Sequence, residues 1–140
     1  MRARGFTLLE LLVVVAIMAL ATAGVGLAMR DSSQSLLERE AERLAALLES
    51  ARARSRASGE PVLWRPVAQG FEFQGLPQDA LPHQWLEEGT AVLGSVTLTL
   101  GPEPIIGRQE LALTRSGEPT RKLRIATDGL RPFAVMADAP

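Results

Sequence analysis

The sequence predicts an α+β fold in which one long N-terminal helix packs on an antiparallel β-sheet. Three observations predict this fold. An apolar run opens the chain, an amphipathic helical pattern continues from it without a break, and short alternating segments between turn residues fill the rest. A length of 140 residues is that of a single domain, and a hydrophobic content of 46% excludes a disordered chain.

The apolar run extends from Phe6 to Met29, and Glu10 carries its only charge. As a helix that rises about 1.5 Å per residue, this run reaches across a bilayer core of about 30 Å. Arg2 and Arg4 precede the run, and the cytoplasmic ends of membrane spans favour basic residues. We therefore expect a single-pass membrane protein with a cytoplasmic N-terminus and with most of the chain on the far side of the membrane.

A secretory signal peptide is the alternative interpretation of this segment. Arg2 and Arg4 would form its charged region, and Ala21-Thr22-Ala23 matches the small-residue pattern of a cleavage site. Glu10 argues against it, because an acid in such a segment costs about 2.5 to 3.5 kcal/mol at mid-membrane and gives an export signal no benefit. The helical pattern also continues past this site, where a secreted domain would begin with a loop.

A specific arrangement of residues surrounds the acid, namely Arg4-Gly5-Phe6-Thr7-Leu8-Leu9-Glu10-Leu11 followed by Val13-Val14-Val15-Ala16-Ile17. This arrangement resembles the class III signal of type IV pilins and type II secretion pseudopilins. The resemblance implies that a prepilin peptidase cleaves between Gly5 and Phe6 and methylates the new N-terminus at Phe6. It also implies a pilin-like fold.

Glu10 has a physical role if helices of this kind bundle side by side. A carboxylate among apolar side chains is costly unless an opposite charge pairs with it, so the arrangement that pairs it is selected. The resemblance implies that Glu10 pairs with the N-terminal amine of a neighbouring subunit and sets the register of assembly. The alternative is that the Glu10 side chain merely reaches the headgroups at the membrane surface.

The helical pattern changes character after Arg30-Asp31, which we interpret as the exit from the membrane. An apolar stripe follows at spacings of three and four, formed by Leu37, Ala41, Leu44, Leu48, Ala51 and Ser55. The charged residues fall mostly on the other faces: Glu38, Arg39, Glu40, Glu42, Arg43 and Glu49. This pattern predicts a helix half buried against a domain.

We expect a single helix from Phe6 to near Ala57. Gly59 supplies the stop signal at its C-terminal end. Gly24 and Gly26 are the positions where such a helix bends most easily.

The rest of the chain has the pattern of short strands and turns. Strands are predicted at 62–64, 70–73, 95–100, 110–114, 122–126 and 132–135. We expect a turn at 66–69, a proline-rich loop at 76–89 and a hairpin turn at Asp128-Gly129. The predicted parts of the chain are a leader peptide (1–5), a transmembrane half-helix (6–29), an amphipathic half-helix (30–58) and a periplasmic β-sheet region (59–140).

Residues with catalytic or metal-binding chemistry are scarce. The chain has no cysteine and one histidine, and no nucleophile, phosphate-loop or metalloprotease motif is present. His83 with Glu87 and Glu88 is a conceivable metal site, but a lone histidine in a proline-rich loop is more often a surface residue. We therefore expect a protein that is not an enzyme and that has no metal and no cofactor.

Two further segments, residues 44–52 in the helix and residues 125–133 near the C-terminus, resemble the H-type minor pseudopilins of type II secretion. Glu10 separates the chain from the K-type tip subunit, which lacks this glutamate. The resemblance implies an inner-membrane subunit of the periplasmic pseudopilus, a filament that exports folded proteins across the outer membrane. Its implied partners are the tip minor subunits I, J and K, the major subunit, the prepilin peptidase, the inner-membrane assembly platform and membrane lipid.

The alternative function is that of a type IV pilus minor pilin that binds DNA in natural transformation. Its phosphate-binding stripe would comprise Arg52, Arg54, Arg56, Arg121, Lys122, Arg124 and Arg131. Loss of Arg2 and Arg4 from the 15 basic residues leaves 13 against 16 acidic ones. Because such a chain is acidic, nucleic acid is not the partner that we expect.

Trp85, a tryptophan among prolines, is either an interface anchor or a core residue.

Overall fold

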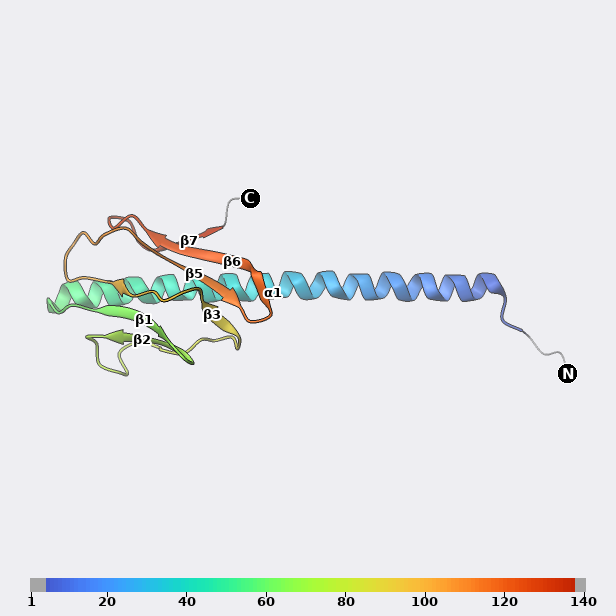
Figure 1. The fold of residues 1–140 in the computed structure, drawn as a ribbon, viewed down its shortest axis with the longest axis horizontal. Helices are drawn as coiled ribbons and strands as arrows, with labels where there is room; N and C mark the ends of the chain where they lie inside the picture. Colours follow the sequence, from blue (N-terminus) through green and yellow to red (C-terminus); the bar gives the residue numbers. More distant parts are fainter. Residues whose placement is uncertain (1–4, 138–140) are drawn as a thin grey trace. The chain divides into compact units, whose positions relative to one another are not determined.

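The computed structural model describes residues 5–137, apart from the side chains of Arg30, Asp31 and Ala137. One helix, α1 (Leu8–Ser58), is followed by short strands (Figure 1). The strands are β1 (Leu63–Val67), β2 (Gly70–Gln74), β3 (Thr90–Val92), β4 (Leu98–Thr99), β5 (Gln109–Arg115), β6 (Glu118–Thr127) and β7 (Ala134–Ala137). The predicted α+β architecture is confirmed.

The bounds of α1 agree closely with the sequence prediction. The helix is regular through Gly24 and Gly26 and ends at Ser58. Gly59 follows with a positive φ of 75°, and its N–H donates to the Ser55 carbonyl at 2.9 Å. A left-handed glycine after the last turn is a common helix stop, because glycine adopts this conformation without a steric penalty.

The chain forms two compact units, and the boundary between them falls inside α1. The first unit ends at Ser35 and the second begins at Leu36. We predicted the exit from the membrane at Arg30-Asp31, but the side chains of these two residues are not among those that the structure describes. The second unit contains every strand and the buried core of the described residues.

The strands form two antiparallel sheets, whereas the sequence predicts a single sheet. Their strand orders are β2-β1-β4 and β3-β5-β6-β7. The sheets meet where the Gln109 side chain of β5 reaches the backbone of Thr99 in β4. Gln109 Oε1 accepts the Thr99 N–H at 2.6 Å, and Gln109 Nε2 donates to the Thr99 carbonyl at 2.8 Å. The amide thus takes the place of a strand partner at this point.

The core forms where both sheets pack on the stripe of α1. All six residues of the predicted stripe are buried, so this prediction is confirmed. The other buried apolar residues are Ala45, Val62, Trp64, Phe71, Leu98, Leu100, Ile106, Leu111, Leu113, Leu123, Ile125 and Phe133. The second unit is therefore a helix half buried against β-structure.

The turn predicted at residues 66–69 is wrong at its start, because β1 continues through Pro66 to Val67. Proline cannot donate a backbone hydrogen bond, so it is tolerated in a strand only where one side lacks a partner. Pro66 meets this condition. It pairs with Phe71 of β2, whereas the pairing of β1 with β4 is confined to Leu63 and Trp64.

Other parts of the strand prediction differ from the structure as well. β6 begins at Glu118, before the predicted 122, and β7 covers Ala134–Ala137 and not 132–135. Only β4, Leu98–Thr99, forms within the predicted strand 95–100. The three residues of β3 were not predicted, since so short a segment has no periodic signal. β6 and β7 do form a hairpin, but residues 128–133 connect them, so Asp128-Gly129 begins a longer loop and is not a two-residue turn.

A charged residue outside the apolar stripe of α1 is buried. Glu40 is 1% exposed. Its Oε2 accepts the backbone N–H groups of Leu86 (2.8 Å) and Glu87 (3.2 Å), and its Oε1 pairs with Arg43 at 2.9 Å. Glu40 thus fixes the end of the 76–89 loop on the helix.

In the same loop, Trp85 is partly buried and packs against the core, which favours the core alternative for this residue.

Candidate functional site

The segment before α1 places the predicted cleavage bond outside regular structure. Gly5 and Phe6 are exposed and precede the helix, and the Phe6 residue is 79% exposed. Thr7 is the N-cap. Its Oγ1 accepts the Glu10 N–H at 3.2 Å, and its carbonyl accepts the Leu11 N–H at 3.1 Å. This cap sets the start of α1 at Leu8, so the Gly5–Phe6 bond remains non-helical.

Sequence reasoning did not predict the role of Thr7, although a signal for it is present. The spacing Thr7-x-x-Glu10 is that of a capping box, in which a threonine caps a helix and a glutamate occupies the third helical position. A carboxylate in the first turn also interacts favourably with the positive end of the helix dipole. Glu10 therefore favours helix formation at this position even before any partner is considered.

The Glu10 side chain is exposed in a strongly apolar environment. Within residues 5–137, its carboxylate makes no hydrogen bond and no ion pair. Phe6 lies just before the helix, and the large exposed apolar residues of the first unit that lie on its sides are Leu8, Leu9, Leu11, Leu12, Val13, Val14, Val15, Ile17, Met18, Leu20, Val25, Leu27 and Met29. A helix that is apolar all round is suited to lipid or to a bundle of similar helices.

The hydropathy of α1 agrees with this environment. Among the described residues, α1 is the one helix long and apolar enough to cross a membrane, with a mean hydropathy of 2.5 in its most apolar window. None of this window is buried inside the protein. Length and composition thus permit a membrane span.

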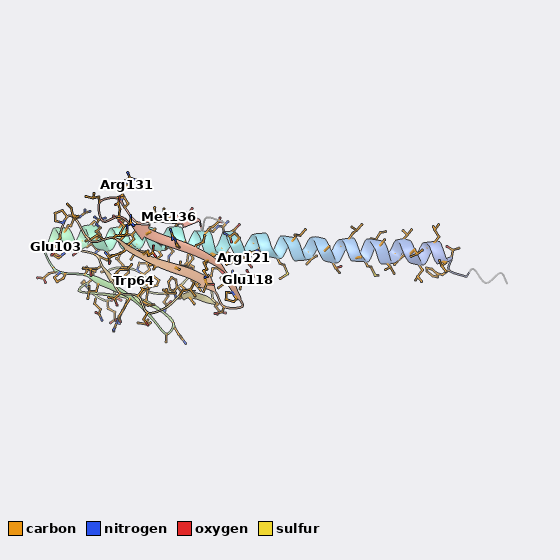
Figure 2. All side chains as sticks on the ribbon, turned by 45° about the horizontal axis from the view of Figure 1, so that its top comes forward. Trp64, Glu103, Glu118, Arg121, Arg131 and Met136 are labelled. Carbon is orange, nitrogen blue, oxygen red and sulfur yellow. The ribbon has the colours of Figure 1, made fainter. Side chains whose placement is uncertain are left out.

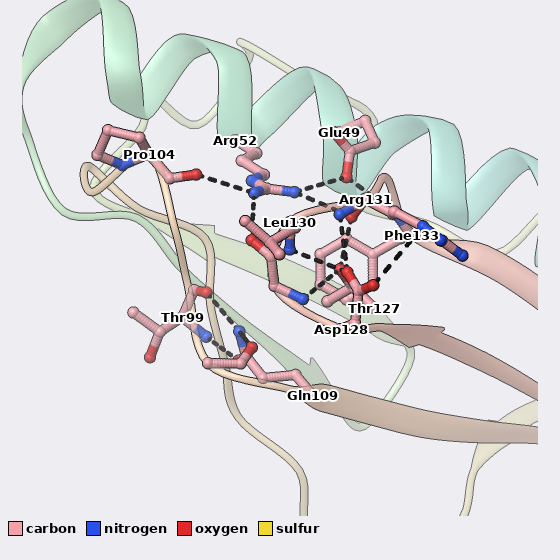
Figure 3. A network of polar contacts seen from close by, with 12 residues as sticks. Glu49, Arg52, Thr99, Pro104, Gln109, Thr127, Asp128, Leu130, Arg131 and Phe133 are labelled. Atoms are coloured by element: carbon pink, nitrogen blue, oxygen red, sulfur yellow. Dashed lines mark hydrogen bonds and ion pairs between the residues drawn. The ribbon is translucent and has the colours of Figure 1, made fainter.

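The predicted basic stripe is not brought together as one surface, because Arg52 is buried. Its side chain is 2% exposed and lies between α1 and two loops (Figure 3). Nη2 donates to the carbonyls of Gly129 (2.8 Å) and Pro104 (3.1 Å), and Nη1 donates to the carbonyl of Arg131 (3.3 Å) and to Glu49 (3.5 Å). Arg52 is a structural residue and is not available to bind phosphate.

The loop between β6 and β7 is held by its own polar contacts as well. Asp128 Oδ1 accepts the backbone N–H groups of Arg131 (2.8 Å) and Leu130 (2.9 Å). These hydrogen bonds, with that from Arg131 the stronger cause, hold the pKa of Asp128 below its ordinary value of 3.8. Gly129 has a φ of 94°, and an added Cβ would clash with the carbonyl oxygen of Ile106, so only glycine fits there.

Other basic residues of the stripe have acidic neighbours. Arg121 pairs with Glu118 at 3.6 Å, and Arg131 pairs with Asp128 at 3.8 Å. Figure 2 shows Arg121 and Glu118 at the start of β6, away from Arg131.

His83 is exposed, and its carbonyl accepts the Phe71 N–H at 2.9 Å. No cluster of three metal-ligating side chains occurs in the part of the chain that the structure describes.

The comparison with protein families gives one match. Residues 1–26 match the prokaryotic N-terminal methylation motif. Comparisons with curated proteins and with solved structures return no significant match. The match covers the capped start of α1 and its apolar segment as far as Gly26, which together contain Gly5, Phe6 and Glu10.

Proposed function

From the N-terminal methylation motif, which indicates a type IV pilin-like subunit of a pilus or pseudopilus, we propose that this chain is an H-type minor pseudopilin of a type II secretion system. In this role it is a structural subunit near the tip of the periplasmic pseudopilus. The filament helps to export folded proteins across the outer membrane. The chain acts by binding its neighbours and not by catalysis.

The position of Glu10 supports the general part of the proposal, that the chain is a subunit of a pilin-like filament. The H-type part rests on the resemblance of residues 44–52 and 125–133 to that subunit. The Glu10 carboxylate lies in the first turn of a helix whose apolar side chains are exposed. When such helices bundle, an unpaired carboxylate among them is costly. The amine that cleavage creates on Phe6 of a neighbouring subunit is a cation at the same end of the bundle. Pairing of Glu10 with this amine fixes the axial register of one subunit on the next.

Processing at Phe6 is the second part of the proposal. Thr7 caps α1, so the Gly5–Phe6 bond lies in an exposed, non-helical segment where a peptidase can bind it. Prepilin peptidase cleaves this bond, releases residues 1–5 and methylates the amine of Phe6.

Residues 6–29 span the inner membrane in the proposed topology, with the N-terminus in the cytoplasm. The amphipathic half-helix (30–58) and the β-sheet region (59–140) lie in the periplasm. The proposed partners there are the tip minor subunits I, J and K and the major subunit. In the membrane the chain contacts lipid and the assembly platform.

The proposal is tested in a strain that lacks this gene and carries wild type, Glu10→Ala or Glu42→Ala at native expression. Glu42 is an exposed glutamate on the same helix and serves as the matched control. We expect wild type and Glu42→Ala to restore export of folded proteins into the medium. Glu10→Ala should leave the domain folded and cleavage largely intact, yet fail to restore filament incorporation and export.

Equal export with Glu10→Ala and wild type would refute the register role of Glu10. Loss of DNA uptake with intact export would favour the competing assignment, a DNA-binding minor pilin. The burial of Arg52 weakens that assignment, because it removes one residue from the proposed phosphate-binding stripe. The acidic balance of the chain weakens it further, since it repels a polyanion.

A further inference from the structure

A groove lies on the outer face of the sheet that contains β5, β6 and β7. Residues that alternate along a strand point to opposite faces, and the buried Leu111, Leu123 and Ile125 define the face toward the core. Arg124 and Ala126, which alternate with Leu123 and Ile125 along β6, belong to the opposite face. These two residues line a groove of about 310 Å³ together with side chains of β7 and of both adjoining loops.

The groove combines an apolar floor with a basic rim. Its floor includes the small side chains of Ala126 and Ala134 and the half-exposed Met136. Three arginines contribute to its lining, namely Arg108 before β5, Arg124 in β6 and Arg131 after β6. Figure 2 shows Arg131 and Met136 on the same side of the domain. Segments distant in sequence thus bring three guanidinium groups around one apolar depression.

Two of these arginines can bind an added anion. Arg108 is exposed and makes no hydrogen bond or ion pair with any residue in the described range 5–137. The Arg131 side chain is 86% exposed, and its pair with Asp128 is long at 3.8 Å. Asp128 is already held by two backbone N–H groups, and an exposed pair of this kind contributes little.

We propose that this groove binds an extended acidic segment of a partner protein, in which carboxylates alternate with small apolar residues. The carboxylates bind Arg108 and Arg131, because guanidinium groups match carboxylates in geometry and charge. The apolar side chains cover the alanines and Met136. The proposal goes beyond the H-type assignment and does not depend on it, since it concerns a separate surface in the second unit.

The acids of the groove favour a peptide over a nucleic acid. Glu110 and Asp128 also line the groove, so acidic residues stand among its basic ones. A nucleic acid carries a phosphate at every nucleotide and places some of them against these two acids, where like charges repel. A peptide can leave those positions apolar and direct its carboxylates to the arginines alone.

The experiment measures binding to the detergent-solubilised full chain by fluorescence anisotropy. The probe is a labelled decapeptide in which glutamate and alanine alternate, and the control probes are the glutamine-alanine peptide and a DNA duplex. The variant is Arg108→Gln with Arg131→Gln. Its matched control is Arg54→Gln with Arg56→Gln, which makes the same change in net charge at two exposed arginines outside the groove.

We expect the acidic peptide to bind wild type and the control variant equally, and to bind the groove variant at least about tenfold more weakly. Binding should weaken as salt is added, because the ion pairs are at the surface. Three results would overturn the proposal: no binding of the acidic peptide to wild type, an equal loss in both double variants, or tighter binding of the DNA duplex than of the peptide at the same arginines. Unchanged thermal unfolding of the groove variant shows that a loss is not a folding defect.

Discussion

The buried guanidinium of Arg52 joins α1 to the loop between β4 and β5 and to the loop between β6 and β7. It donates to three backbone carbonyls and to Glu49, and Glu49 in turn accepts the Phe133 N–H at 2.9 Å. Sequence periodicity places Arg52 near the exposed end of the helix and does not reveal this role. Its partners come from loops more than fifty residues away in the chain, so only the tertiary fold decides that this arginine is buried while Arg54 is not.

Replacement of Arg52 by leucine should destabilise the second unit by about 3 kcal/mol. The change leaves the carbonyl of Gly129 without its donor in a buried place and those of Pro104 and Arg131 without theirs in partly buried ones. Arg54→Leu, at an exposed position two residues away, should change stability by less than about 0.5 kcal/mol. Denaturation followed by the fluorescence of the buried Trp64 measures both effects. Equal stability of the two variants would contradict the structural role of Arg52.

Asp128 makes stability depend on pH in the acid range. Hydrogen bonds from Arg131 and Leu130 lower its pKa in the folded state below the ordinary 3.8. Its contribution to stability is therefore fully present above about pH 3.8 and is lost as the pH falls through the lower folded pKa. Asp128→Asn keeps the acceptor oxygen but does not titrate. Melting curves from neutral pH downward should show a steeper acid loss for wild type than for this variant, and parallel curves would refute the assignment.

At the scale of elements, the burial of the helix stripe was predictable from the sequence, whereas the positions of the strands were only partly predictable. When apolar residues recur at every third or fourth position, a helix can turn only one side toward a core, and the six residues of the stripe from Leu37 to Ser55 are buried accordingly. The sheets depend on long-range pairing. Two short segments, β3 and β4, are strands only because β5 and β1 pair with them. Burial of Glu40 has the same origin, since the loop that carries Leu86 provides its donors.

Truncation of the stripe should be much more costly than truncation of an exposed leucine. Leu48 is fully buried, so Leu48→Ala leaves a cavity between α1 and the sheets and should cost about 2 to 5 kcal/mol. Leu86→Ala removes the same atoms from a residue that is 65% exposed, and it should cost less than about 1 kcal/mol. Denaturant titration of the two variants compares them directly. Similar midpoints would show that the stripe does not support the domain.

At the scale of the whole molecule, the two units of the chain differ in how many apolar side chains they expose. The first unit exposes its large apolar side chains, and the second buries most of its large apolar side chains in a core. The candidate processing site was predictable because Gly5, Phe6 and Glu10 form a local motif. The role of Thr7 was missed although its spacing indicates it. The arginine groove could not be predicted, because β5, β6, β7 and two loops assemble it only in the folded state.

The measurement that tests the central claim most directly is the mass of the mature chain after extraction from membranes. We predict a chain that begins at Phe6 and carries one methyl group on its N-terminal amine. In a strain without prepilin peptidase, the same protein should retain residues 1–5 and lack the methyl group. A mature chain that begins at Gly24 would contradict the account, since it would identify the apolar segment as an ordinary secretory signal that is cleaved after Ala23.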